Sequence, residues 1–212
     1  MCFNMVVLHD STNKINKKEI IEIVKENMEF NKDGFFCFIG YEYPKKRNYY
    51  TLRTLNGQHF LQFLETNIRE DTTFVHIHLR YATSGIVSPL NIHGWKTSSG
   101  WWFSHNGFYF AYQKSDKSDS LQYFEKEFEP YVEGKKNKLN IYNLYGVTFA
   151  NYYDEKLLVI PSQKTAKLYK RDDGYLITNE ELKTTPDRYI VTPSLIYRRN
   201  LEIVKFNDVM TQ

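Results

Sequence analysis

The clearest hydrophobic pattern in the chain is a strict alternation over residues 73–80. Val75, Ile77 and Leu79 would share one face of an extended segment, because successive side chains of a strand point to opposite sides. The other face would carry Phe74, His76, His78 and Arg80. The pattern therefore predicts a strand with one aliphatic face and one largely polar face.

Other apolar runs predict further strands. Residues 2–8 form a short apolar run at the start of the chain, which is typical of a buried strand. Aromatic-rich stretches over residues 35–43 and 49–54 predict two more. In the second half, weaker apolar runs predict strands over residues 144–150, 156–160, 165–170, 174–178, 188–192 and 201–206.

Three segments have the spacing of amphipathic helices. Residues 17–29 repeat apolar side chains at i, i+4 and i+8, and they follow Asn16, which forms a plausible capping pair with Glu19. Residues 57–69 and 119–128 show the same kind of apolar stripe. The chain is therefore expected to be an α+β protein with mostly antiparallel strands and two or three helices.

Turn-forming residues mark the connections. Residues 84–100 are rich in Gly, Ser, Asn and Pro, which indicates a long loop. Asn106-Gly107 predicts a hairpin turn between strands at residues 101–105 and 108–112, because this dipeptide is the strongest short hairpin signal. No repeat or flexible linker interrupts the chain, so residues 1–212 are expected to form one domain.

Composition narrows the classes of function. The chain has 212 residues, of which 42% are hydrophobic and 25% charged, a globular composition. A net charge of +3 is too small for a dedicated nucleic-acid partner. No apolar run reaches the roughly 20 residues needed to span a membrane, and no signal peptide is recognisable. Two cysteines form neither a disulfide framework nor a four-ligand zinc site, so a reducing, cytoplasmic location is expected.

Cys2 is the first candidate for chemistry. A small residue after the initiator Met1 favours removal of that methionine, which would leave Cys2 with a free α-amino group. That amine has a reference pKa of about 7.7–8.0, so it could serve as the base for the thiol on the same residue. The alternative is a cysteine buried in an N-terminal strand without any chemical role.

Two further positions suggest how a substrate could be held. Arg80 ends the alternating strand, and arginine is the natural bidentate partner of a carboxylate, although a strand-end arginine is commonly a solvated charge. Asn106 and Gly107 could offer a side-chain N–H and a backbone N–H to a developing oxyanion, although the same pair also suits a simple turn. Each position is ambiguous alone, and together they are far more specific.

Ordered motifs accompany these candidates over residues 1–128. They are Met1-Cys2, Asp33-Gly34, His78-Leu79-Arg80-Tyr81-Ala82-Thr83-Ser84-Gly85, Asn91-Ile92-His93, His105-Asn106-Gly107 and Ser118-Asp119-Ser120. In this order they resemble the class-II glutamine amidotransferase domain, a glutaminase of the N-terminal-nucleophile (Ntn) hydrolases. The later stretch of residues 189–195 is only faintly similar to the family.

The resemblance implies a fold and a reaction. The fold would be a four-layer αββα sandwich of two mainly antiparallel sheets between helices. Cys2 would attack the side-chain amide of L-glutamine to give a γ-glutamyl thioester and ammonia, and water would then release glutamate. Asn106 and Gly107 would hold the oxyanion.

The resemblance also implies how glutamine is held. Arg80 would bind the substrate α-carboxylate with help from Thr83, and Asp119 would bind the α-ammonium. The family commonly has glycine after the nucleophile, where this chain has Phe3, a change that could reshape the pocket floor. No metal, cofactor, nucleic acid or membrane is implied.

The sequence leaves the use of the ammonia open. The preferred hypothesis is a glutaminase that hands ammonia to a synthase on another chain. A free-standing amidohydrolase acting on another γ-glutamyl-type amide is the first alternative, and a non-catalytic binding protein on the same fold is the second. A cysteine peptidase fits less well, because no separate Cys–His–Asn set is recognisable.

Overall fold

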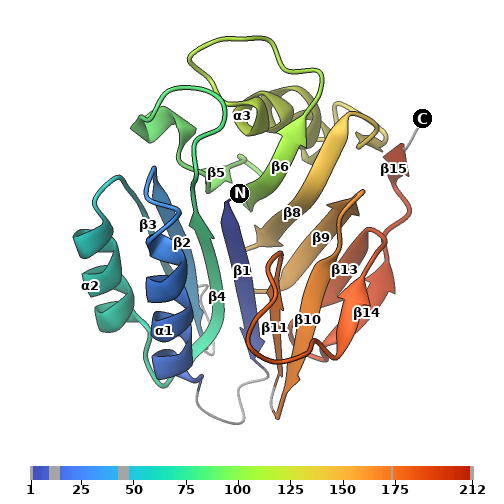
Figure 1. Cartoon of the computed structure of the whole chain (residues 1–212). Helices are drawn as coiled ribbons and strands as arrows, with labels where there is room; N and C mark the ends of the chain where they lie inside the picture. The colour runs from blue at the N-terminus through green and yellow to red at the C-terminus, as the bar shows by residue number, and fades with distance from the viewer. Residues whose placement is uncertain (1, 10–14, 43–47, 173, 211–212) are drawn as a thin grey trace.

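The computed structural model describes residues 2–9, 15–42, 48–172 and 174–210. Within them, two sheets lie face to face and helices cover the outer side of each (Figure 1). The expected α+β class and the four-layer αββα order are therefore confirmed. Two residues named in the expectations lie outside the described residues. They are Met1, the first residue of the expected domain, and Tyr43, the last residue of the strand expected over residues 35–43.

The first sheet has seven strands with β1 (Phe3–His9) at its centre. Its order is β12-β10-β11-β1-β4-β2-β3, and all neighbouring strands with a described register are antiparallel. The other strands are β2 (Phe35–Tyr41), β3 (Asn48–Thr54), β4 (Thr72–Leu79), β10 (Ala166–Arg171), β11 (Gly174–Thr178) and β12 (Arg188–Ile190). Every residue of β1, β2 and β4 is buried, because both faces of this sheet are covered.

The second sheet is antiparallel with the order β14-β13-β9-β8-β6-β5. Its strands are β5 (Trp95–Lys96), β6 (Trp101–Tyr109), β8 (Leu144–Tyr152), β9 (Lys156–Ser162), β13 (Ser194–Tyr197) and β14 (Glu202–Lys205). A short parallel pair joins β7 (Leu139–Asn140) to β15 (Val209–Met210).

The helices form the two outer layers. α1 (Lys17–Met28) and α2 (Gly57–Asn67) pack on the first sheet. The second sheet is covered by α3 (Asp119–Tyr123), a π-helical turn η2 (Phe124–Phe128) and α4 (Glu129–Val132). A single 3₁₀ turn, η1 (Pro89–Asn91), lies in the long loop before β5. None of the helices in the described ranges has the length and apolar character required to cross a bilayer.

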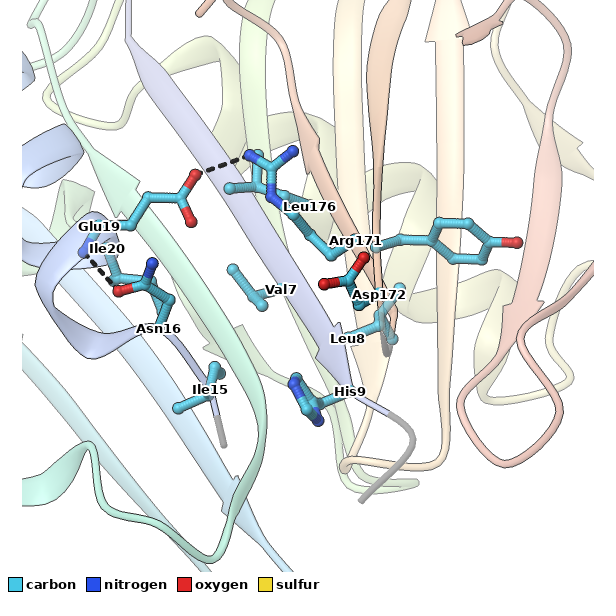
Figure 2. Close-up of a pocket in the computed structure, with 11 residues that line it drawn as sticks. Val7, Leu8, His9, Ile15, Asn16, Glu19, Ile20, Arg171, Asp172 and Leu176 are labelled. Atoms are coloured by element: carbon cyan, nitrogen blue, oxygen red, sulfur yellow. Dashed lines mark hydrogen bonds and ion pairs between the residues drawn. The ribbon is translucent and has the colours of Figure 1, made fainter. Parts of the chain in front are cut away.

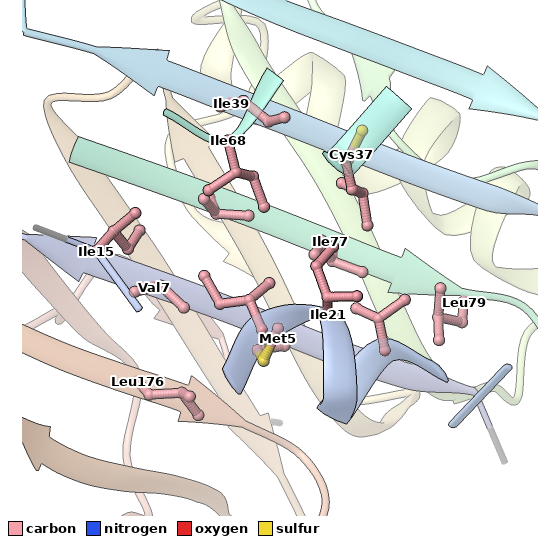
Figure 3. Packing of buried hydrophobic residues seen from close by; sticks show 14 of the residues in the cluster. Met5, Val7, Ile15, Ile21, Cys37, Ile39, Ile68, Ile77, Leu79 and Leu176 are labelled. Atoms are coloured by element: carbon pink, nitrogen blue, oxygen red, sulfur yellow. The ribbon is translucent and has the colours of Figure 1, made fainter. Parts of the chain in front are cut away.

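Three apolar clusters hold the layers together. The first lies between the first sheet and its helices and contains Val75, Ile77 and Leu79 of β4 (Figure 3). The second lies between the two sheets and contains Phe74. The third lies under α3 and η2. The alternation read from residues 73–80 is thus confirmed, and its polar face points into the interior between the sheets.

The expected hairpin at Asn106-Gly107 is wrong. β6 continues straight through these residues and pairs with β8, so that Gly107 lies opposite Gly146. Gly107 has a φ of +151°, and a Cβ there would lie 1.8 Å from the carbonyl oxygen of Tyr145. The dipeptide therefore permits a close approach between two strands, a use that the local sequence does not distinguish from a turn.

Other boundaries differ in smaller ways. The helix expected over residues 119–128 is present but becomes π-helical at Phe124 and continues to Val132. The strand expected over residues 188–192 ends at Ile190, and Pro193 precedes β13, a strand that we did not expect and that belongs to the other sheet. Phe3 packs in the cluster beneath the helices, so its side chain faces away from the interior between the sheets. Its effect on a pocket floor stays a prediction.

The N-cap of α1 offers a test of a feature expected from sequence alone. The Asn16 side chain accepts a hydrogen bond from Glu19 N at 3.1 Å. We expect Asn16→Ala to lower the free energy of unfolding by about 1 kcal/mol in urea titrations, whereas Asn16→Asp keeps the acceptor and costs much less. Equal losses in the two variants would contradict the capping role.

Candidate active site

Cys2 precedes the central strand β1 and is half-buried. The backbone N–H of Tyr81 donates to its Sγ at 3.3 Å, and the thiol donates to the Tyr81 carbonyl at 3.4 Å. Burial raises the pKa of the thiol, although the Tyr81 N–H and the charge of Arg80 oppose this effect. The thiol is therefore protonated at neutral pH, and a base is required to make it a nucleophile.

Arg80 follows β4 directly, and the pairing of Leu79 with Phe3 brings it beside Cys2. Its backbone is fixed by the turn at Asp33 and Gly34: Asp33 N donates to Arg80 O at 2.9 Å, and Arg80 N donates to Gly34 O at 2.8 Å. The Asp33 carboxylate accepts from Ala82 N at 2.8 Å. The turn therefore sets where the chain leaves the sheet.

The guanidinium of Arg80 is buried, with 2% of the residue exposed. It donates to the carbonyl oxygens of Ser84 at 2.8 Å and Ile86 at 3.3 Å. In the described part of the chain it forms no ion pair with a carboxylate. Burial lowers its pKa, while the charges of Asp119 and Asp33 counteract this effect, so the group stays cationic. A buried charge held only by carbonyl dipoles can accept a carboxylate from a ligand.

Asp119 begins α3 and is 5% exposed. Its Oδ1 accepts from Ser84 Oγ at 2.5 Å, and its Oδ2 accepts from Tyr109 N at 2.9 Å. Neither partner carries a charge, and within the described ranges no cation pairs with it. Its charge acts on the Cys2 thiol and on Arg80. Ser84 therefore touches both groups, through its carbonyl on Arg80 and its hydroxyl on Asp119.

Asn106 and Gly107 lie on β6 in the facing sheet. Ser104 Oγ donates to Asn4 Oδ1 at 2.9 Å, which links β6 to β1. Asn106 shares the face of Ser104, and Cys2 is two residues before Asn4. Since β1 and β6 run in opposite directions, Cys2 and Asn106 lie toward the same end of the sandwich (Figure 1).

The Asn106 side chain has unused hydrogen-bonding capacity. The residue is 5% exposed, and its Oδ1 is buried without a hydrogen-bond partner in the described part of the chain. The Asn106 amide is thus not required for a hydrogen bond within the described part of the fold. Its role as an oxyanion donor, together with Gly107, stays a prediction.

The remaining expected site residue is Thr83. It is exposed, and within the described residues its hydroxyl has no hydrogen bond. Its help in holding a carboxylate stays a prediction. The neighbouring Ser84, whose hydroxyl donates to Asp119, was not expected in the site. The adjacent hydroxyl residues Thr83 and Ser84 were the only local signal, and the sequence does not indicate which of the two faces inward.

Four histidines fill the interior beside the site. His76 lies 2.7 Å from both Asn151 Oδ1 and Ser104 Oγ, and His105 Nδ1 lies 3.0 Å from Thr148 Oγ1. The rings of His78 and His93 stack with centroids 3.7 Å apart. Burial lowers the pKa of all four. Across the ranges that the structure describes, no three His, Cys, Asp or Glu side chains are arranged to hold a metal ion.

A separate cavity of about 220 Å³ lies at the other end of β1, next to His9 and Leu8 (Figure 2). Its rim carries the ion pair between Arg171 and Glu19, with an N–O distance of 2.7 Å. Because β1 separates it from Cys2 by the length of the strand, this cavity does not belong to the site.

Comparisons with known proteins give a fold and no close relative. No protein-family model and no curated protein matches the sequence. The structure is similar to a glutamine phosphoribosylpyrophosphate amidotransferase from B. subtilis, with a TM-score of 0.58 and 11% identity over 98% of this chain. It is also similar to a glutamine aminotransferase class-II domain protein from Silicibacter pomeroyi, with a TM-score of 0.52 and 12% identity over 97% of this chain.

A third similar structure is described as the allosteric regulatory enzyme of purine biosynthesis, with a TM-score of 0.55 and 10% identity over 98% of this chain. This chain covers 49% of the first and third structures and 99% of the second. Identities this low show a shared fold, the Ntn-hydrolase fold, and they do not by themselves carry a reaction.

The close contact between Gly107 and the facing strand leads to one prediction. A Cβ on Gly107 would meet a backbone oxygen, so we expect Gly107→Ala to lower the free energy of unfolding by at least about 2 kcal/mol in urea titrations. Gly134 also has a positive φ of +73°, but a Cβ added there would have no atom within 4 Å. Gly134→Ala should therefore cost only about 1 kcal/mol, and equal costs would contradict the steric explanation.

The buried histidines lead to a prediction about how stability depends on pH. Burial lowers the pKa of His76 and of His105 to about 4, against about 6.5 in the unfolded chain. Between these values the unfolded chain binds more protons than the native one, so the free energy of unfolding should fall by up to about 2 kcal/mol per histidine from pH 7 to pH 5.

Substitution of single histidines can show which residues cause this pH dependence. We expect His76→Gln to reduce it by the share of one histidine, up to about 2 kcal/mol, in urea titrations at the two pH values, because this residue no longer titrates while the other buried histidines still do. His59 is exposed, so His59→Gln makes the same substitution at the surface and controls for the chemical change itself. A slope of undiminished size in His76→Gln would contradict a neutral, buried imidazole at residue 76.

Proposed function

We propose that this chain hydrolyses the side-chain amide of L-glutamine, with Cys2 as the nucleophile after removal of Met1. The observation that carries the proposal is the pair of buried charges beside the thiol. Arg80 has no carboxylate partner in the described ranges, Asp119 has no cation there, and both charges act on Cys2. A free amino acid supplies the complementary carboxylate and ammonium on one carbon atom.

The similar structures support the same reading. Two of them are described as a glutamine phosphoribosylpyrophosphate amidotransferase and a glutamine aminotransferase class-II domain protein. The motifs that resemble class-II glutamine amidotransferases include the residues that form this charged pair. On this proposal residues 1–212 act as one glutaminase domain.

The proposed reaction uses the thiol in its protonated resting state. The α-amine of Cys2 takes the thiol proton, and Sγ attacks the amide carbon, whose oxygen becomes negative. The Asn106 side chain and Gly107 N–H would donate to that oxygen. The intermediate collapses to a γ-glutamyl thioester when the α-ammonium returns its proton to the leaving ammonia. Water then adds to the thioester, and glutamate and the free thiol are released.

The fate of the ammonia is a further part of the proposal. The loop after Arg80 exposes four large apolar side chains, each about half accessible: Tyr81, Ile86, Val87 and Leu90. An exposed apolar rim next to the nucleophile favours transfer to a synthase on another chain. Hydrolysis of another γ-glutamyl-type amide by a free-standing enzyme is the alternative.

The test is glutamate release from L-glutamine by the purified chain, beside Cys2→Ala, with the intact mass of both proteins recorded. We expect Met1 to be absent and equal amounts of glutamate and ammonia to form. Cys2→Ala should lose at least about 10³-fold in rate, because the covalent step of the proposed reaction uses the Cys2 thiol.

Three outcomes would decide against parts of the proposal. A retained Met1 would block the α-amine and exclude the mechanism. Unchanged activity in Cys2→Ala would exclude Cys2. If Met1 is absent and no glutamate forms, labelling of Cys2 by a diazoketone analogue of L-glutamine would point to a missing partner chain, and no labelling would point to a different amide or to a binding protein.

A further inference from the structure

Asn91 joins two backbone segments that lie beside the charged pair. It is the last residue of η1 and is fully buried. Its Nδ2 donates to the carbonyl oxygens of Ile86 at 2.9 Å and Asp116 at 2.6 Å, and its Oδ1 accepts from Ser118 N at 2.7 Å. One side-chain amide thus connects the loop after Arg80 to the chain that enters α3.

Each of these segments carries part of the candidate site. The Ile86 carbonyl that Asn91 holds also accepts from the Arg80 guanidinium. Ser118 caps α3 by accepting from Leu121 N at 3.2 Å, and Asp119 follows it in the chain. Asn91 therefore lies between the group that holds the cation and the backbone that places the anion.

Gly85 makes the contact between these segments direct. Its φ is +68°, and a Cβ at this position would lie 2.6 Å from Ser118 N and 2.9 Å from Asn91 Nδ2. In addition, Ile86 N donates to the Asp116 carbonyl at 3.1 Å. No side chain separates the two segments, so their spacing is set by backbone contact and by the Asn91 amide.

Asn91 is itself anchored to the first sheet. Arg53 on β3 donates to the Pro89 carbonyl at 3.0 Å and to the His93 carbonyl at 3.1 Å, on either side of Asn91. It also donates to the carbonyl of Ile92. The amide is thus held at a fixed position relative to the sheet that carries Cys2 and Arg80.

We infer that Asn91 is a positioning residue that fixes the separation between the Arg80 guanidinium and the Asp119 carboxylate. The inference rests on the proposed function. The carboxylate and ammonium of an amino acid are attached to one carbon, so both can be bound only if the two protein charges keep a set spacing. Asn91 would therefore determine selectivity for a zwitterionic substrate over an amide that lacks the α-ammonium.

The test compares hydrolysis of L-glutamine with that of glutaramate, which keeps the carboxylate and the side-chain amide but has no α-amine. In the native chain L-glutamine should be preferred. Asn91→Asp replaces the NH₂ group and its two N–H donors with one oxygen that faces two carbonyl oxygens. We therefore expect the preference to fall about tenfold or more, mainly through a higher KM for L-glutamine. General damage to the fold would slow both substrates together.

Three controls accompany this experiment. Asn67 on α2 donates to the Phe63 carbonyl at 2.8 Å, so Asn67→Asp makes the same chemical change away from the site and should keep the native preference. Alkylation of Cys2 by iodoacetamide should proceed at similar rates in native and Asn91→Asp proteins. Asn91→Ser removes the bonds without adding charge and replaces Asn91→Asp if that variant does not fold.

The outcomes separate the inference from the proposed function. A folded Asn91 variant with the native preference would overturn the positioning role while leaving the glutaminase intact. Native protein that neither hydrolyses L-glutamine nor is labelled at Cys2 by the diazoketone analogue would refute the proposed function, and the inference with it.

Discussion

Arg80 carries a positive charge at a position that is almost completely removed from water, and much of the candidate site is arranged around that charge. Burying an ion without compensation costs several kcal/mol, so the surrounding chain has to supply dipoles. The carbonyl groups of Ser84 and Ile86 do so, which requires the loop to fold back over the end of β4. Because these groups are dipoles without net charge, the site keeps a cation that a ligand can neutralise.

The interior next to this cation is polar as well, which is unusual for the middle of a sandwich. Neutral imidazoles serve there because they pair with amides and hydroxyls without adding charge. His76, between Asn151 and Ser104, and His105, beside Thr148, are the clearest cases. Burial lowers the pKa of His78 and His93, and the charge of Arg80 lowers it further. Neutral imidazoles and a cationic Arg80 are therefore mutually consistent.

The fold and the chemistry are supported by different observations. The two facing sheets and the similar structures establish the Ntn-hydrolase fold. The sequence identity between this chain and those structures is only 10–12%. That fold places the start of its central strand, and hence Cys2, at one end of the sandwich. The case for an amino-acid substrate comes instead from this chain's own charges, Arg80 and Asp119, bridged by Ser84.

Features that local patterns encode could be predicted from the amino-acid sequence. These features are the alternation in β4, the cap at Asn16, the apolar stripes of the helices and the ordered motifs through Asp119. Each depends on residues that are close together in the sequence. Features that depend on distant partners became apparent only in the folded chain. The local sequence of Asn106-Gly107 is typical of a turn, but in the folded chain Gly146 lies opposite Gly107 in a continuous strand pair. Likewise, only the folded chain shows that Ser84, not Thr83, reaches Asp119. Contacts between segments far apart in sequence fix these choices, and no local pattern records them.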